Sequence, residues 1–201
     1  MKRRTSITGA SILMAGLLLA ALAAAGDAPV PAAPALPATA AEPPAKPLPT
    51  PEGTTLTKPG QVAPAFTVPT LDGKGFTLAD HKGKVVLVNW FATWCGPCKS
   101  EMPPLKSRIW DVYGTNPGFV MVSISRGEDA AKVEPFAKER GLPWTIGLDA
   151  DKAAFGLYAA AYIPRNYVIG RDGRILYQSE GFTEAEFAKM IAVLKKELAA
   201  R

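Results

Sequence analysis

Residues 94–98 read Trp94-Cys95-Gly96-Pro97-Cys98, and they hold the only two cysteines of the 201-residue chain. They follow residues 85–91 (VVLVNWF), an apolar and β-branched run that predicts a buried strand. Residues 99–113 predict a helix, so the first cysteine stands where a strand passes into a helix. Free backbone N–H groups and the helix dipole favour an anion at that point. Because the thiolate is the reactive form of cysteine, we expect Cys95 to attack substrates and Cys98, one turn into the helix, to be the protected resolving thiol.

Other roles for the two cysteines fit the sequence less well. A CxxC disulfide closes a very short loop and therefore adds little stability, which argues against an inert structural bond. A structural zinc site needs four ligands, whereas the chain offers two cysteines and one histidine, His81, which we interpret as a loop residue. Thiolates also suit Cu(I), but no histidine follows the motif to complete a copper site. We therefore interpret the pair as a redox couple that uses no metal and no cofactor.

The N-terminal segment has the pattern of an export signal. Lys2, Arg3 and Arg4 precede a charge-free stretch of 19 residues, 7–25, which ends in three alanines. This pattern predicts a secretory signal peptide or an uncleaved signal anchor over residues 1–26, with possible membrane anchoring through residues 7–25. In either case the rest of the chain is expected to lie outside the cytoplasm, where disulfide chemistry operates.

The remaining charge and composition indicate a spacer and one folded domain. Three of the five net positive charges belong to the N-terminal segment, and no basic stripe remains that would indicate nucleic-acid binding. Nine of the 27 residues from 27 to 53 are proline and most others are small, so we predict a disordered Pro/Ala-rich linker over residues 27–56. The folded domain is then expected to cover residues 57–201.

Hydrophobic periodicity and turn signals predict an α/β domain, with a mixed central sheet and helices on both faces. A hairpin is expected around the Asp72-Gly73 turn, and Pro103 and Pro104 should kink or interrupt the helix after the motif. A capping box, Thr183 and Glu186, opens the last helix. The other expected elements are strands at 118–125, 144–148, 166–169 and 174–178, and helices at 129–140 and 152–161.

This order of elements, with WCGPC after the first core strand, resembles the thioredoxin fold and, more closely, the exported TlpA/ResA-like branch of the thioredoxin-like proteins (redoxin/AhpC-TSA-type domains). The resemblance covers roughly residues 57–199. Residues 60–73 look like the added N-terminal β-hairpin of that branch, and residues 98–103 resemble its C-x-x-E-x-P continuation. The long stretch between Cys95 and Ile163-Pro164 matches its inserted α/β segment.

The resemblance also implies roles for individual residues. Pro164 is the candidate for a cis-proline that faces the CxxC motif and presents substrate backbone, together with Ile163. The family continues with small hydroxyl residues after this proline, whereas Arg165 follows here, a cation that could stabilise the Cys95 thiolate. The remaining residues expected to contact substrate are Trp94, Gly96 and Pro97.

A buried acid is the next expectation. Thioredoxins carry a carboxylate on the strand before the motif, and this chain has Asn89 at the matching place. Glu101 resembles the substitute used by the TlpA/ResA-like branch, a carboxyl beneath the sulfurs whose pKa is raised by burial and which activates Cys98. The alternative for Glu101 is a solvated charge in the first turns of the helix, favoured there by the dipole.

These observations predict an exported thiol–disulfide oxidoreductase, in which Cys95 attacks a substrate disulfide and Cys98 resolves the mixed disulfide. Gly-Pro between the cysteines is the thioredoxin dipeptide, which favours a reductant. The resemblance implies protein disulfide substrates in the periplasm, of the cytochrome c maturation or copper-site assembly type, and a membrane thiol transporter as electron donor.

Three alternatives remain open. The chain could be a non-catalytic copper-binding or redox-sensing thiol module on a Pro-rich tether. Among enzymes, it could be a disulfide oxidase. A peroxidase is a weaker alternative, because Ala92 occupies the position where the peroxiredoxin pattern requires Thr or Ser.

Overall fold

The computed structural model describes residues 52–200. The predicted signal segment, and the predicted linker up to residue 51, lie outside the described residues. Residues 52–56 were predicted to belong to the linker but pair with the folded domain, through a β-bridge between Thr55 and Ala159. Within residues 52–200, no helix combines the length and the apolar character that a bilayer span requires.

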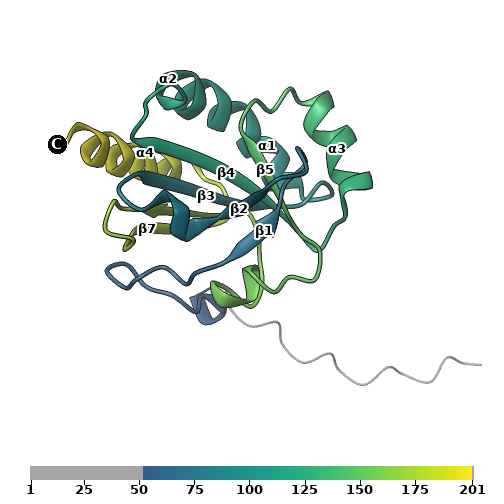
Figure 1. The fold of residues 1–201 in the computed structure, drawn as a ribbon, viewed down its shortest axis with the longest axis horizontal. Helices are drawn as coiled ribbons and strands as arrows, with labels where there is room; N and C mark the ends of the chain where they lie inside the picture. Colours follow the sequence, from purple (N-terminus) through teal and green to yellow (C-terminus); the bar gives the residue numbers. More distant parts are fainter. Residues whose placement is uncertain (1–51, 201) are drawn as a thin grey trace, which may run out of the picture. The chain divides into compact units, whose positions relative to one another are not determined.

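A five-stranded mixed sheet forms the centre of the domain (Figure 1), in the order β5-β4-β3-β6-β7. β3 is the central strand: it runs parallel to β4 and antiparallel to β6, and all seven of its residues are buried. Since β3 is covered on both faces, its sequence is apolar throughout except at Asn89, as expected. The strands are β3 (Val85–Phe91), β4 (Phe119–Arg126), β5 (Thr145–Asp149), β6 (Arg165–Ile169) and β7 (Ile175–Glu180).

The α-helices of the described chain pack against one face of this sheet and not against both faces as predicted; short 3₁₀ turns lie on the other face. The apolar side chains of the α-helices form a single cluster with alternate residues of the strands, including Leu87 and Met121. α4 begins directly after Thr183, whose Oγ1 accepts a hydrogen bond from the Glu186 backbone N–H at 3.2 Å, the predicted cap. The helices are α1 (Gly96–Pro104), α2 (Asp111–Tyr113), α3 (Ala130–Glu139) and α4 (Glu184–Ala199).

The helix after the cysteine motif is interrupted at the predicted place. α1 ends at Pro104, a π-helical segment follows over Leu105–Trp110, and one further turn, α2, completes it. Pro103 and Pro104 have no backbone N–H and cannot donate the hydrogen bonds that would continue an α-helix. The two prolines therefore separate the short helix that carries the cysteines from the segment behind it.

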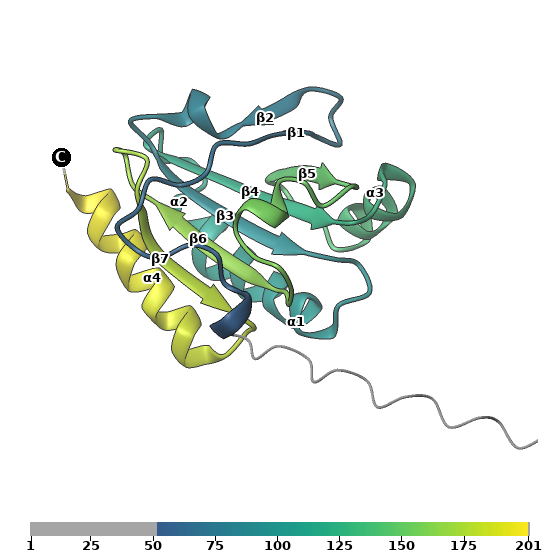
Figure 2. The same cartoon turned by 90° about the horizontal axis from the view of Figure 1, so that it is seen from below.

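The opposite face of the sheet is covered by the N-terminal hairpin and by short 3₁₀ turns (Figure 2). The hairpin pairs β1 (Thr67–Pro69) with β2 (Gly75–Thr77) around the predicted Asp-Gly turn. Phe66 and Trp90 pack together in this second cluster, with ring centroids 5.8 Å apart and ring planes tilted by 54°. The turns are η2 (Leu78–His81) and η4 (Phe155–Leu157), and a third 3₁₀ turn, η1 (Glu52–Thr54), opens the described chain.

The helix predicted over residues 152–161 is wrong in extent, because only the 3₁₀ turn η4 forms there. The backbone groups that would continue a helix are bonded to the start of the domain instead. Leu56 N–H donates to the Tyr158 carbonyl at 3.0 Å, and Ala160 N–H donates to the Thr54 carbonyl at 2.8 Å. A short β-bridge to residues 54–56 has therefore replaced helical pairing.

Candidate active site

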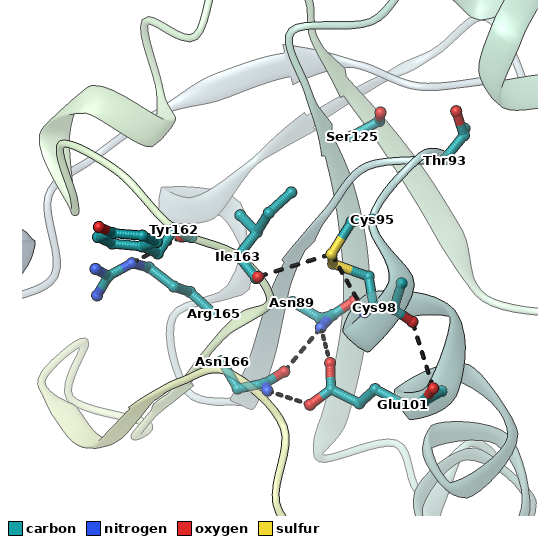
Figure 3. The surroundings of a disulfide bond; sticks show 12 residues. Asn89, Thr93, Cys95, Cys98, Glu101, Ser125, Tyr162, Ile163, Arg165 and Asn166 are labelled. Carbon is teal, nitrogen blue, oxygen red and sulfur yellow. Dashed lines mark hydrogen bonds between the residues drawn. A yellow bond between two sulfur atoms is a disulfide. The ribbon is translucent and has the colours of Figure 1, made fainter. Parts of the chain in front are cut away.

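The two cysteines form a disulfide at the N-terminus of α1 (Figure 3). Cys95 is the N-cap residue, and its Sγ accepts a hydrogen bond from the Cys98 backbone N–H at 3.3 Å. Cys95 is 5% exposed and Cys98 is 0% exposed. The N-cap position places Cys95 where the free N–H groups and the helix dipole stabilise a thiolate. Both cysteines are thus largely buried in the disulfide, and Cys95 is the slightly more exposed of the two.

The loop before β6 faces the disulfide. The Ile163–Pro164 peptide bond is cis, and the Ile163 carbonyl oxygen lies 3.7 Å from Cys95 Sγ. Tyr162, the preceding residue, has a φ of 61°, a backbone conformation that is uncommon for a side chain of this kind. This loop directs the Ile163 carbonyl group toward the reactive sulfur.

A depression of about 470 Å³ lies over Cys95 and contains most of the predicted substrate-contacting residues. Trp94 stands at its rim with 64% of its surface exposed. Pro164 is buried and does not line the depression, in contrast to Ile163. The lining residues are Trp94, Cys95, Gly96, Pro97, Arg126, Ala161, Tyr162 and Ile163. The surface offered to a substrate is thus open, largely apolar and centred on the attacking sulfur.

Glu101 is buried on α1, with 1% of its surface exposed, so it is not the solvated charge of the alternative reading. Asn89 Nδ2 donates to Glu101 Oε2 at 3.0 Å, and Asn166 Nδ2 donates to Oε1 at 2.6 Å. Burial raises the pKa of Glu101 from 4.5 to about 7, and the hydrogen bonds from Asn166 and Asn89 oppose this rise. Glu101 lies one helical turn after Cys98, and its pKa is in the range that general-base catalysis near neutral pH favours.

Asn89 and Asn166 belong to a polar chain that crosses the sheet. Ser123 Oγ donates to Asn89 Oδ1 at 2.9 Å, and Trp144 Nε1 donates to Ser123 Oγ at 2.9 Å. Asn89 is the register partner of both Ser123 on β4 and Asn166 on β6. From the sequence, Asn89 was expected at the place of the acid that Glu101 replaces, but Asn166 and Ser123 were not connected with Glu101. Each is a polar residue inside an apolar strand, which is the signal that could have found them.

Burial of Glu101 makes stability depend on pH. Its pKa in the native state lies above the ordinary value, so protonation favours the folded protein, and this contribution is complete below pH 4.5 and lost as the pH rises through about 7. We expect the unfolding free energy of the oxidised wild type to fall, relative to that of Glu101→Gln, by about 3 kcal/mol between pH 4.5 and pH 8. Urea denaturation of both proteins at a series of pH values measures this difference. Parallel curves would contradict the assigned titration.

Contrary to the expectation from the sequence, Arg165 does not lie beside the cysteines. Its guanidinium points away from the disulfide (Figure 3) and is 1% exposed. Nη2 forms an ion pair with Glu180 at 2.8 Å, and Nε donates to the carbonyl groups of Ala161 and Tyr162 at 3.0 and 3.1 Å. The remaining bonds, from Nη1 to Thr55 and from Nη2 to Thr54, are both 2.7 Å long. A buried charge needs such partners, so Arg165 holds the loop that carries Ile163 and Pro164 and does not stabilise the Cys95 thiolate.

Glu128 is a site residue that the sequence analysis missed. It is 4% exposed, and its carboxylate accepts hydrogen bonds from Thr93 N–H at 2.8 Å, Thr93 Oγ1 at 2.6 Å and Ser125 Oγ at 2.7 Å. These bonds tie the loop before Trp94 to the end of β4. No local pattern distinguishes Glu128 from a surface glutamate, because Thr93, which donates two of these bonds, is 35 residues away in the sequence.

His81 lies away from this site. Its ring stacks on Phe76, with centroids 4.6 Å apart, and partial burial lowers its pKa. This arrangement agrees with a loop histidine that packs on the hairpin.

The fold and the site together define a thioredoxin-fold thiol–disulfide oxidoreductase. The chain belongs to the AhpC/TSA family, whose model matches residues 59–178. It is 32% identical over 122 residues to the thiol-disulfide oxidoreductase ResA of Bacillus thuringiensis (strain Al Hakam), covering 61% of this chain and 69% of that protein. ResA of Bacillus subtilis (strain 168) is 31% identical over 117 residues, covering 58% and 64%.

Solved structures show the same fold. A Bacteroides thetaiotaomicron protein, proposed to be a protein disulfide isomerase, superposes with a TM-score of 0.70 and 37% identity over 72% of this chain and 92% of that chain. A thiol:disulfide interchange protein of the thioredoxin family from Chlorobium tepidum TLS has a TM-score of 0.58 and 30% identity, over 71% and 99%. These similarities agree with the resemblance on which the sequence analysis relied.

Proposed function

We propose that this oxidoreductase works outside the cytoplasm as a reductant of protein disulfides. The observation that carries the proposal is the Cys95-Gly96-Pro97-Cys98 couple, which caps α1 opposite the Ile163 carbonyl group. The thioredoxin dipeptide between the cysteines favours a low reduction potential, near the roughly −270 mV of thioredoxin and below the roughly −120 mV of the oxidant DsbA. The N-terminal export pattern supports an extracytoplasmic location, in the periplasm, with a Pro-rich spacer before the domain.

The reaction has two exchange steps. The Cys95 thiolate attacks one sulfur of the substrate disulfide, which forms a mixed disulfide and releases the other substrate sulfur as a thiolate. Cys98, deprotonated by Glu101, then attacks Cys95 Sγ and releases the second substrate sulfur. The substrate gains two electrons and two protons, and the enzyme is left with the Cys95–Cys98 disulfide.

Each turnover leaves the enzyme oxidised, so a reductant in an oxidising compartment needs an electron source. A membrane thiol transporter would fill this role, and proteins of cytochrome c maturation or copper-site assembly would be the substrates. These partners follow from the resemblance to the TlpA/ResA-like branch, and membrane anchoring through residues 7–25 would keep the domain near such a donor.

The reduction potential of the couple tests the proposal. We expect a value near or below about −230 mV for the domain equilibrated against a glutathione or dithiothreitol series. A value between about −120 and −150 mV would instead make the protein an oxidase or isomerase. Stoichiometric Cu(I) binding by the reduced protein, without insulin reduction, would favour the copper-binding module.

A further inference from the structure

Arg126 is the feature of the substrate depression that the mechanism does not use. It is the last residue of β4, and it lines the depression together with Trp94, Cys95 and Tyr162. Among the described residues that line this depression, Arg126 alone carries a charge. A cation at the rim of an apolar site discriminates between substrates of different charge.

The guanidinium of Arg126 is held in place by packing. Its Cζ lies 4.5 Å from the centroid of the Phe155 ring, and its Nε is buried without a hydrogen-bond partner. In the part of the chain that the structure describes, it forms no ion pair. Because stacking fixes the planar group beforehand, little side-chain entropy is lost when it meets a carboxylate.

Asp149 is the acidic residue nearest to Arg126 in the sheet, where the two are register partners on β5 and β4. Its carboxylate accepts hydrogen bonds from the backbone N–H groups of Ala154 at 3.1 Å and Phe155 at 2.8 Å. Asp149 thus caps the turn that carries the Phe155 ring. It supports the platform under Arg126, and its negative charge favours the charged guanidinium, although no ion pair joins the two side chains within residues 52–200.

We propose that Arg126 is a specificity-determining residue that receives a carboxylate of the substrate polypeptide. The substrate class is then a protein whose disulfide cysteine has Asp or Glu close to it in the chain. The carboxylate would lie on Arg126 while the substrate sulfur meets Cys95 Sγ, so binding and orientation are favoured together. This inference rests on the proposed function, in that Cys95 must react with polypeptide disulfides.

The test compares three disulfide peptides that differ only beside the cysteine, where they carry Asp, Asn or Lys. The rate of reduction of each peptide by the reduced protein is measured by stopped flow at low and high salt. For the wild type we expect the Asp peptide to react about fivefold faster than the Asn peptide at low salt, and less so at high salt. In Arg126→Gln this ratio should fall to about one, and in Arg126→Glu the Lys peptide should become the preferred substrate.

Arg140 offers a matched control. Its guanidinium also lies over a ring, 5.1 Å from the Phe136 centroid, and its Nε is also buried without a partner. It follows α3 and lines a different cavity. Arg140→Gln is therefore expected to keep the preference for the Asp peptide.

The outcomes separate the two proposals. An unchanged preference for the Asp peptide in Arg126→Gln would overturn the role of Arg126 and leave the proposed function intact. Equal wild-type rates for all three peptides would have the same consequence. Failure of the wild type to reduce even the Asn peptide would overturn the proposed function, and this inference with it. Loss of the preference in both Arg126→Gln and Arg140→Gln would also overturn the assignment, since net charge would then explain it.

Discussion

Cys95→Ala is expected to abolish disulfide reduction, with a loss of at least about 10³-fold, because the thiolate is the only nucleophile that can open the substrate disulfide. The other cysteine cannot replace it. Cys98 is 0% exposed, and the chain contains no third cysteine. Insulin reduction with dithiothreitol as electron donor measures the loss, after subtraction of the rate without enzyme.

Cys98→Ala is the matched variant for this prediction. It retains the attacking thiol but cannot resolve the mixed disulfide, so we expect a covalent enzyme–substrate complex that is visible on a non-reducing gel and absent for Cys95→Ala. The reverse result, with a complex formed only by Cys95→Ala, would exchange the two assigned roles. Since the four-residue disulfide loop adds little stability, both variants should unfold at urea concentrations similar to that of the oxidised wild type.

Glu101→Gln is expected to slow the second exchange step by about 10²-fold at neutral pH, because a positioned general base typically contributes 10²–10⁴-fold. Burial raises the pKa of Glu101 to about 7, so the rate of this step in the wild type should rise as the pH passes through that value. The variant cannot lose a proton at this position and should lack the rise. Single-turnover release of the second substrate thiol, followed from pH 5 to pH 9, measures both effects.

Asp149→Asn is the control for Glu101→Gln. Asp149 is a second buried carboxyl whose pKa is raised by burial, but it caps the turn at Ala154 and Phe155 and does not belong to α1. The same acid-to-amide change there should lower stability and leave the rise near pH 7 intact. If Glu101→Gln retained the wild-type pH profile, Glu101 would be a structural residue and another group would deprotonate Cys98.

Local sequence patterns predicted the elements that carry the reactive groups. Strand β3 was predicted over the residues that form it, because a continuous apolar run is typical of a strand covered on both faces. The break at Pro103 and Pro104 and the cap at Thr183 follow from the chemistry of those residues alone. Cys95 and Cys98 were found in the same way, since spacing and a strand–helix junction suffice to identify them.

The sequence could not predict which charged and polar side chains are buried, nor which partners they bind. Whether Glu101 is solvated or buried depends on Asn89 and Asn166, which β3 and β6 bring to it from 12 and 65 residues away. Arg165 stands next to Pro164 in the sequence, yet its partners Thr54 and Glu180 turn it away from the cysteines. The local sequence around Glu101 and Arg165 is compatible with the expected and with the observed positions of these side chains. Only contacts with residues distant in the sequence distinguish the two.

Local sequence patterns predicted an α/β domain and located the two cysteines at a strand–helix junction, because hydrophobic period, proline chemistry and helix termini are local properties. Other features depend on contacts between distant segments of the folded chain. The tertiary structure replaced a predicted helix by the turn η4, since residues 54–56 take up the backbone hydrogen bonds of residues 158–160. It also set the pKa of Glu101 and brought Arg126 to the rim of the substrate depression, because burial and charge pairing depend on which distant segments the sheet brings together.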